Sequence, residues 1–118
     1  MMFEPPPRSL SEDATPQARL VPSELRAEAA SASAFLKALG HEGRLMILCH
    51  LVTGEKSVGD LERLIGARQA AVSQQLARLR LQGLVTCRRE GKAQFYAIGD
   101  ERVRRTVELI YEMFCTAS

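Results

Sequence analysis

Several residue types and patterns are scarce or missing in this 118-residue sequence. It has no Trp, and aromatic residues make up only 5% of it, so the core must be built mainly from aliphatic side chains. No apolar run approaches the ~18 residues that a membrane-spanning helix needs, and no basic segment followed by an apolar one begins the chain. A secretory signal is therefore not expected, and the expected location is the cytoplasm. Three cysteines in such a chain argue against a structural disulfide framework.

The sequence also lacks the residue sets that catalysis or metal binding requires. It has no Ser-His-Asp set, no phosphate-binding glycine loop and no paired carboxylates, so the chain is not expected to be an enzyme, and no cofactor is expected. Its two histidines, His41 and His50, miss the four-residue spacing that places two imidazoles on one metal. A soft ion would need three or four thiolates, and only two cysteines are expected to lie near each other.

Acidic residues are missing from one stretch of the chain. The net charge is only +2, but no Asp or Glu occurs between Arg68 and Arg89, whereas acids cluster earlier, at Ser11–Asp13 and Asp60–Glu62. A local basic face on a nearly neutral protein is typical of contact with nucleic-acid phosphates.

Proline divides the chain into an arm and a domain. All five prolines lie in Met1–Pro22, which has few apolar residues and is predicted to be a disordered arm. Residues 23–118 have the length of one domain, and their apolar spacing predicts a mainly α fold with a small β-hairpin.

The first part of the domain is predicted to form two helices. One runs from Ser23, as its N-cap, to Leu39. Its packing side is predicted to consist of Leu25, Ala29, Ala32, Phe35, Leu36 and Leu39. The other helix covers Glu42–Thr53 and is predicted to be the buried centre of the domain, because only Met46 and His50 are left to face outward.

A helix-turn-helix is predicted next. A short helix from Ser57 is followed by a turn at Ile65–Ala67 and a second helix over Arg68–Gly83. The second helix has an apolar stripe of Val72, Leu76 and Leu79. Its other positions carry amides, hydroxyls, guanidiniums and small side chains, which suit phosphates and base edges in a major groove. For this stretch alone, an ordinary amphipathic helix that happens to be basic is the alternative.

After Gly83 the apolar period switches to two, which predicts a wing. Residues 84–87 and 95–98 are predicted to form two strands joined around Arg88–Lys92. A two-stranded ribbon with a basic tip can lie along a phosphate backbone. The predicted DNA contacts are Gln69, Ser73, Gln74, Gln75 and Arg78 in the groove, Arg68 and Arg80 on phosphates, and Arg88, Arg89, Lys92 and Gln94 on the wing.

A last helix, capped by Asp100, is predicted to run to about Cys115. Its stripe consists of Val103, Val107, Ile110, Tyr111 and Phe114. So many large apolar side chains on a terminal helix suggest that something covers them. A homodimer through the N- and C-terminal helices is therefore predicted, with two recognition helices ~34 Å apart on an inverted repeat. Packing of both helices on their own subunit is the alternative.

Three motifs taken together resemble the ArsR/SmtB family of winged-helix repressors. They are Leu39–Leu45, Val72–Leu79 and Gly83–Val85, and the resemblance extends from Ser23 to the C-terminus. It implies a repressor that binds double-stranded operator DNA. Many members sense metals, but Ser57–Asp60 stands where they have a Cys-x-Cys pair, and no His follows His50. Metal sensing is therefore not expected.

The surroundings of Cys49 and Cys115 are similar to the sulfide- and persulfide-responsive branch of that family. In this branch, one Cys in the second helix and one near the end of the last helix react with persulfides. A disulfide or polysulfide bridge forms, and the repressor leaves its operator. The resemblance implies that Cys49 and Cys115 are a redox sensor for reactive sulfur species. From the residues alone, both thiols could be inert members of the core.

A haem- or metalloid-responsive regulator of the same fold, with Cys49 or His50 as a ligand, is the alternative function. Cys87 lies on a predicted strand and has no counterpart in the motifs, so it is expected to be a bystander. Convergence of all three cysteines would favour the binding of trivalent arsenic.

Overall fold

The computed structural model describes residues 20–115, so almost all of the predicted N-terminal arm lies outside the described residues. The chain divides into two compact units between Ala34 and Phe35. The first helix, α2 (Pro22–Leu39), spans this boundary. Pro22 occupies the first helical position, where its fixed φ and missing N–H are tolerated, and the Val21 carbonyl accepts from the amides of residues 24 and 25 at 2.9 and 3.2 Å. The prediction that Ser23 caps this helix is wrong, because Ser23 lies inside its first turn.

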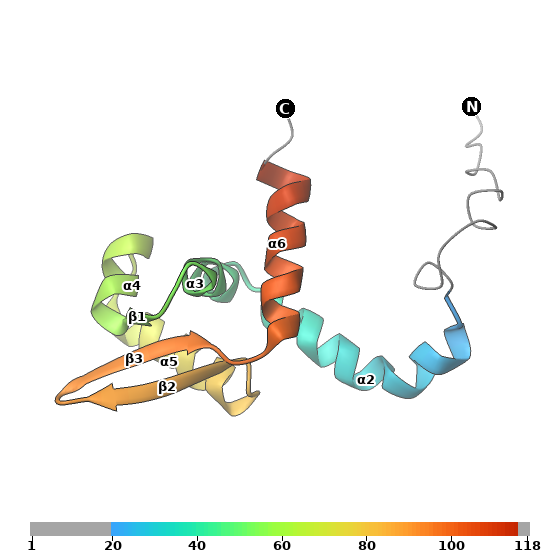
Figure 1. The fold of residues 1–118 in the computed structure, drawn as a ribbon, viewed down its shortest axis with the longest axis horizontal. Coiled ribbons are helices and arrows are strands. Elements are labelled where there is room, and N and C mark those ends of the chain that lie inside the picture. Colours follow the sequence, from blue (N-terminus) through green and yellow to red (C-terminus); the bar gives the residue numbers. More distant parts are fainter. Residues whose placement is uncertain (1–19, 116–118) are drawn as a thin grey trace. The chain divides into compact units, whose positions relative to one another are not determined.

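The second unit contains the helix-turn-helix and the wing (Figure 1). Its elements are α3 (Glu42–Val52), β1 (Lys56–Ser57), α4 (Val58–Ile65), α5 (Gln69–Leu81), β2 (Val85–Glu90), β3 (Ala93–Ile98) and α6 (Glu101–Cys115). The three strands form an antiparallel sheet in the order β1-β3-β2. The mainly α fold with a small β-hairpin is confirmed, with the short strand β1 in addition.

The hairpin turn is tighter than the sequence indicated. Glu90 pairs with Ala93, so only Gly91 and Lys92 connect the strands, and Gly91 has a φ of +64° that a two-residue turn of this kind favours. Arg88 and Arg89 therefore belong to strand β2, not to the connecting loop as predicted. The sequence did not predict this end of β2, because three consecutive charged residues, Arg88, Arg89 and Glu90, show no alternation of apolar and polar side chains.

Local side-chain hydrogen bonds explain where three helices begin. The His41 Nδ1 atom accepts from the Arg44 amide at 3.3 Å at the start of α3. Ser57 and Asp60 form a reciprocal capping box at the start of α4. The Asp100 carboxylate accepts from the Arg102 amide at 2.8 Å, which confirms Asp100 as the cap of α6.

Helix α3 lies at the centre of the second unit and contacts α4, α5, α6 and β3. Its fully buried residues are Ile47, Leu48 and Leu51. The prediction that α3 is buried nearly all round is only partly right, because Leu45, Cys49 and Val52 are half-buried in the single chain. On α2, Ala38 and Leu39 are buried, but Leu36 is 62% exposed, contrary to the predicted packing side.

Helix α6 is buried at its start and exposed at its end. Val103 and Val107 lie in the core, whereas Tyr111 is 59% and Phe114 is 77% exposed. The predicted stripe therefore contacts its own chain over only part of its length. Within residues 20–115, no helix is long and apolar enough to cross a membrane.

Candidate DNA-binding face and thiol pair

Helix α5 has a buried side and a polar side. Val72, Leu76 and Leu79 are fully buried against the core, as predicted, and fix the rotation of the helix. Ser73, Gln74 and Arg78 are consequently exposed. The first turn of α5 has no acidic residue, so nothing there repels a phosphate backbone. This arrangement can present amides, hydroxyls and a guanidinium to a DNA groove.

Gln75 differs from the other predicted groove residues. It is half-buried, and its Oε1 accepts from Arg44 Nη1 at 3.1 Å. Arg44 also donates through Nε to the Ala38 carbonyl at 2.9 Å and through Nη2 to the Lys37 carbonyl at 3.3 Å. One guanidinium thus joins the last carbonyls of α2 to the recognition helix. The Gln75 side chain is engaged by α3 in this state, which leaves its exposed neighbours on α5 as the side chains available to bases.

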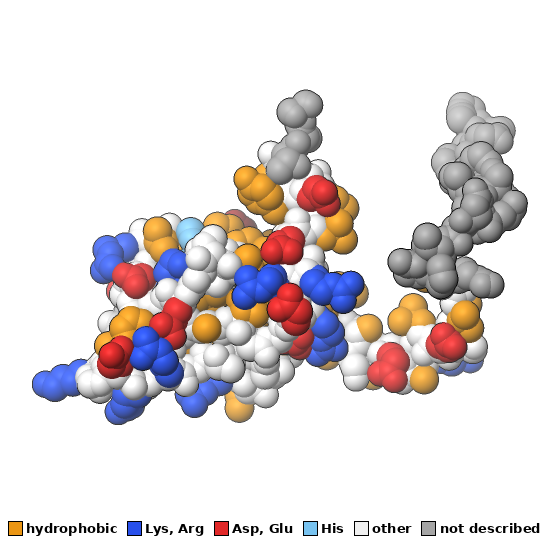
Figure 2. Space-filling view, viewed as in Figure 1, with side chains coloured by type: hydrophobic (Ala, Val, Ile, Leu, Met, Phe, Trp, Pro, Cys, Tyr) orange, Lys and Arg blue, Asp and Glu red, His pale blue; other side chains and the backbone are white. Residues whose placement is uncertain are grey.

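The wing and the start of α5 share a surface hollow. It is lined by Ser57, Val58, Gly59, Gln69, Arg89, Lys92, Ala93 and Gln94. The structure therefore brings together four predicted DNA contacts, from α5 and from the wing. Arg89 and Gln94 are directly opposite each other in the ladder and so share one face of the hairpin. Figure 2 shows Lys and Arg side chains gathered around the outer end of the wing.

Two further predicted phosphate contacts flank this face. Arg68 occupies the N-cap position of α5, where its side chain makes no capping hydrogen bond, and it is exposed. Arg80 is exposed near the other end of α5 and lies close enough to Tyr96 to act on that hydroxyl electrostatically. Both positions leave the guanidinium accessible to a partner.

The thiols of Cys49 and Cys115 lie within electrostatic range of each other, although they come from α3 and α6. Burial raises the pKa of the Cys49 thiol, and the neighbouring Cys115 raises it further by repelling a second negative charge. Cys49 is half-buried, whereas Cys115 is exposed, and both are free thiols. If two such thiols meet, they can form a bridge in two steps, with the second thiol resolving the product of the first.

Cys87 lies apart from this pair. It sits on β2 opposite Tyr96 of β3. Burial raises the pKa of the Tyr96 hydroxyl, and a hydrogen bond with Cys87 raises it further. Across residues 20–115, no three His, Cys, Asp or Glu side chains are grouped so that they could hold a metal ion. The convergence of three thiols that would favour arsenic is therefore not found.

The fold and this face define a winged helix-turn-helix DNA-binding regulator. Residues 41–86 match the model of the bacterial regulatory protein family arsR. The biofilm growth-associated repressor of Agrobacterium fabrum is 46% identical over 80 residues, which cover 68% of each chain. The transcriptional activator HlyU of Vibrio cholerae is 40% identical over 95 residues, which cover 80% of this chain and 88% of HlyU.

Solved structures are similar over most of their length. Reduced HlyU aligns with a TM-score of 0.75 at 40% identity, covering 79% of this chain and 98% of HlyU. A homodimeric winged helix-turn-helix DNA-binding domain of Mycobacterium bovis aligns with a TM-score of 0.65 at 34% identity, covering 75% and 83%. The chain belongs to the arsR family of bacterial regulatory proteins. This family consists of transcriptional regulators and not of enzymes.

Proposed function

We propose that this protein is a cytoplasmic, homodimeric transcriptional repressor that senses reactive sulfur species. A disulfide or polysulfide bridge between Cys49 and Cys115 would release it from an operator with an inverted repeat. The observation that carries the proposal is that these two thiols, on different helices, are within electrostatic range, so that Cys115 contributes to the raised pKa of Cys49. Repression is proposed from the likeness to the biofilm growth-associated repressor, although the similar HlyU is named an activator.

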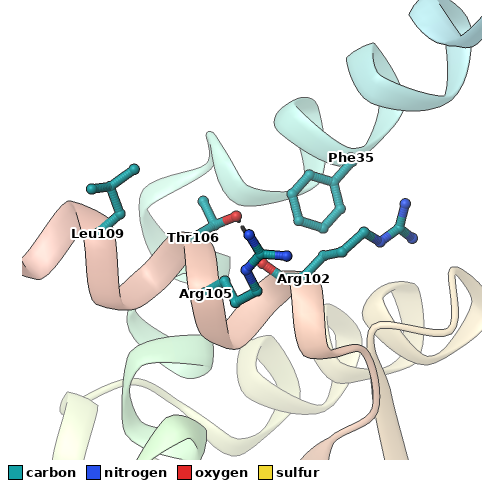
Figure 3. Close-up of a pocket in the computed structure, with 5 residues that line it drawn as sticks. All are labelled: Phe35, Arg102, Arg105, Thr106 and Leu109. Carbon is teal, nitrogen blue, oxygen red and sulfur yellow. Dashed lines mark hydrogen bonds between the residues drawn. The ribbon is translucent and has the colours of Figure 1, made fainter. Parts of the chain in front are cut away.

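The exposed apolar residues of α6 support a homodimer. Leu109, Tyr111, Met113 and Phe114 are each more than half exposed, and Figure 2 shows hydrophobic side chains along the free end of this helix. A surface hollow lies nearer the start of α6. It is lined by Phe35 of α2 and by four residues of α6, which are Arg102, Arg105, Thr106 and Leu109 (Figure 3). A second copy that covers this face would remove apolar surface from water and set the distance between two recognition helices.

The chemistry of the thiol pair balances with a persulfide as the oxidant. The thiolate of one Cys attacks the outer sulfur of R–S–SH, which gives a protein persulfide and releases RS⁻. The thiolate of the other Cys then attacks the sulfur bonded to the protein and expels HS⁻. Two protein thiols and one persulfide thus give one disulfide, one thiol RSH and one H₂S. Trapping of further sulfur atoms would lengthen the bridge by ~2 Å per sulfur–sulfur bond.

The bridge would act on DNA binding through α3. Cys49 belongs to α3, whose Arg44 is hydrogen-bonded to Gln75 of the recognition helix. Cys115 ends α6, which carries the exposed apolar face proposed for the dimer. A covalent link between these helices would therefore bias the position of the recognition helix relative to the dimer contact.

The test combines intact mass with DNA binding. An operator is first selected from a random duplex library with the reduced protein, and the protein is then treated with glutathione persulfide. We expect loss of two hydrogens, with or without gain of whole sulfur atoms, in a bridge mapped to Cys49 and Cys115, together with loss of binding. Cys49→Ser and Cys115→Ser should keep binding after treatment, and Cys87→Ser should respond like the wild type. Unmodified thiols, or a bridge through Cys87, would contradict the proposal.

A further inference from the structure

Arg88 differs from the other basic residues of the wing, because all three nitrogen atoms of its guanidinium donate within the chain. Its Nε and Nη2 atoms donate to the two carboxylate oxygens of Glu55 at 2.8 and 2.9 Å, and its Nη1 donates to Glu90 at 2.9 Å. Two carboxylates on one guanidinium give the cluster a net negative charge. A phosphate that approached Arg88 would have to displace one of them.

Arg88 also faces away from the surface that groups the other candidate DNA contacts. Successive residues of a strand point to opposite faces. Arg88 is paired with Phe95 and stacks on its ring at 4.9 Å, whereas Arg89 is paired with Gln94. Arg89, Gln94 and Lys92 line the hollow beside Gln69 of α5, and Arg88 does not. Arg88 therefore belongs to the other face of the wing.

Glu55, the partner of Arg88, lies in a loop that is itself held by hydrogen bonds. Glu55 is between α3 and β1, and Lys56 beside it donates to the Thr53 hydroxyl at 2.9 Å and to the Gly54 carbonyl at 3.0 Å. Thr53 in turn donates to the His50 carbonyl at 2.6 Å. The loop is thus held against the last turn of α3, and a forked pair with Glu55 connects strand β2 to that loop.

We infer that Arg88 is a positioning residue, which holds the wing to the end of α3 through Glu55 so that Arg89 and Lys92 reach the DNA backbone. The Arg88–Glu55 pair connects the wing to the end of α3, just as the hydrogen bond between Arg44 and Gln75 connects α5 to α3. The inference depends on DNA binding and not on the proposed sulfur chemistry. A guanidinium is required for it, because the single nitrogen of an ammonium cannot form the two parallel hydrogen bonds that Nε and Nη2 donate to Glu55.

The decisive variant is Glu55→Gln. Its DNA affinity should change in opposite directions if Arg88 is a phosphate contact and if Arg88 is a positioning residue. Removing an acid from a DNA-binding surface and releasing Arg88 would tighten binding if Arg88 were a phosphate contact. If Arg88 positions the wing, binding weakens by a few fold. The probe is a fluorescent duplex of random sequence, titrated by anisotropy at several salt concentrations with the reduced full-length protein. Tighter or unchanged binding of Glu55→Gln overturns the inference.

The salt dependence supplies the second readout. Arg89→Gln should lower the slope of log K against log salt by ~0.9 for each phosphate that the variant no longer neutralises. Arg88→Gln and Arg88→Lys should both weaken binding by a few fold and lower the slope to the same extent, because Arg89 and Lys92 then neutralise fewer phosphates. A lower slope for Arg88→Gln that Arg88→Lys restores would identify a point-charge contact and overturn the inference.

Hydrogen exchange separates positioning from general loss of structure. Glu55→Gln and Arg88→Lys should speed amide exchange in β2 and β3 while α3 and α6 exchange as in the wild type. Glu90→Gln is the matched control, because Glu90 shares only one hydrogen bond with Arg88, and its wing should exchange more slowly than that of Glu55→Gln. Equal acceleration in all elements, or none in the wing, counts against the inference.

Discussion

The DNA-binding face and the thiol region differ in which side chains are exposed to water. On α5, an apolar stripe is fully buried and the polar side chains are exposed. Around Cys49 and Cys115, the thiol of Cys49 is half-buried, while large apolar side chains on α6 are exposed. The first region is complete within one chain, because its core-facing residues are already covered. The second region is incomplete, because its apolar surface still faces water.

The largest effect is expected where the DNA-binding face meets the core. Leu76→Ala should lower the free energy of unfolding by about 2–5 kcal/mol, because Leu76 is fully buried and its truncation leaves a cavity. Chemical denaturation followed by circular dichroism measures the change. Leu81→Ala is the matched control on the same helix; Leu81 is 88% exposed, so a change within ~0.5 kcal/mol is expected. Equal costs would remove the distinction between the two sides of α5.

The connection between α2, α3 and α5 is expected to matter next. Arg44→Ala removes three side-chain hydrogen bonds and should cost about 1–3 kcal/mol of stability, because part-buried acceptors lose a charged donor. Arg63→Ala serves as the control, because Arg63 is exposed and, among residues 20–115, its side chain is hydrogen-bonded only to Asp60 of its own helix. An Arg44→Ala protein as stable as the Arg63→Ala protein would show that the junction does not depend on this guanidinium.

The incomplete surface of the thiol region predicts a change in assembly and not in the fold. Phe114→Ser should shift the protein from dimer to monomer in sedimentation velocity and leave the circular dichroism spectrum unchanged, because Phe114 is 77% exposed in the single chain. Leu81→Ser makes a comparable apolar-to-polar change on α5 and should remain dimeric. A dimeric Phe114→Ser protein would place the interface elsewhere.

The smallest effect concerns the reactivity of the buried thiol. Because burial and Cys115 both raise the pKa of Cys49, iodoacetamide should alkylate Cys49 more slowly than Cys115 at neutral pH. Raising the pH should speed the reaction until the pH passes this raised pKa. Cys115→Ser removes the second cause only, so at the alkaline end of the pH series, where two thiolates would repel each other, the Cys49 rate should rise by less than about tenfold. Peptide mass spectrometry over a pH series gives both rates, and an unchanged rate in Cys115→Ser would place the thiols out of electrostatic range.

Several elements could be predicted from the sequence because their signals are local. The stripe of Val72, Leu76 and Leu79, the cap at Asp100 and the switch to strand periodicity after Gly83 all depend on residues close together in the chain. The two residues of β1 are too few to show any period. Arg88 looked like a loop residue because its partners, Glu55 and Phe95, are distant in sequence or across a ladder.

Periodicity and capping were enough to predict the order of the helices and of the hairpin strands and the polar side of the recognition helix, whereas the choice of two cysteines came from the resemblance to the family. The signals of periodicity and capping depend only on residues a few positions apart, so they can be recognised in the sequence without a knowledge of the fold. The hydrogen bonding of Arg88 to Glu55, and the placing of Cys49 within electrostatic range of Cys115, became visible only in three dimensions. Such pairings depend on how buried faces pack α3, α6 and the wing together, and no local pattern encodes that packing.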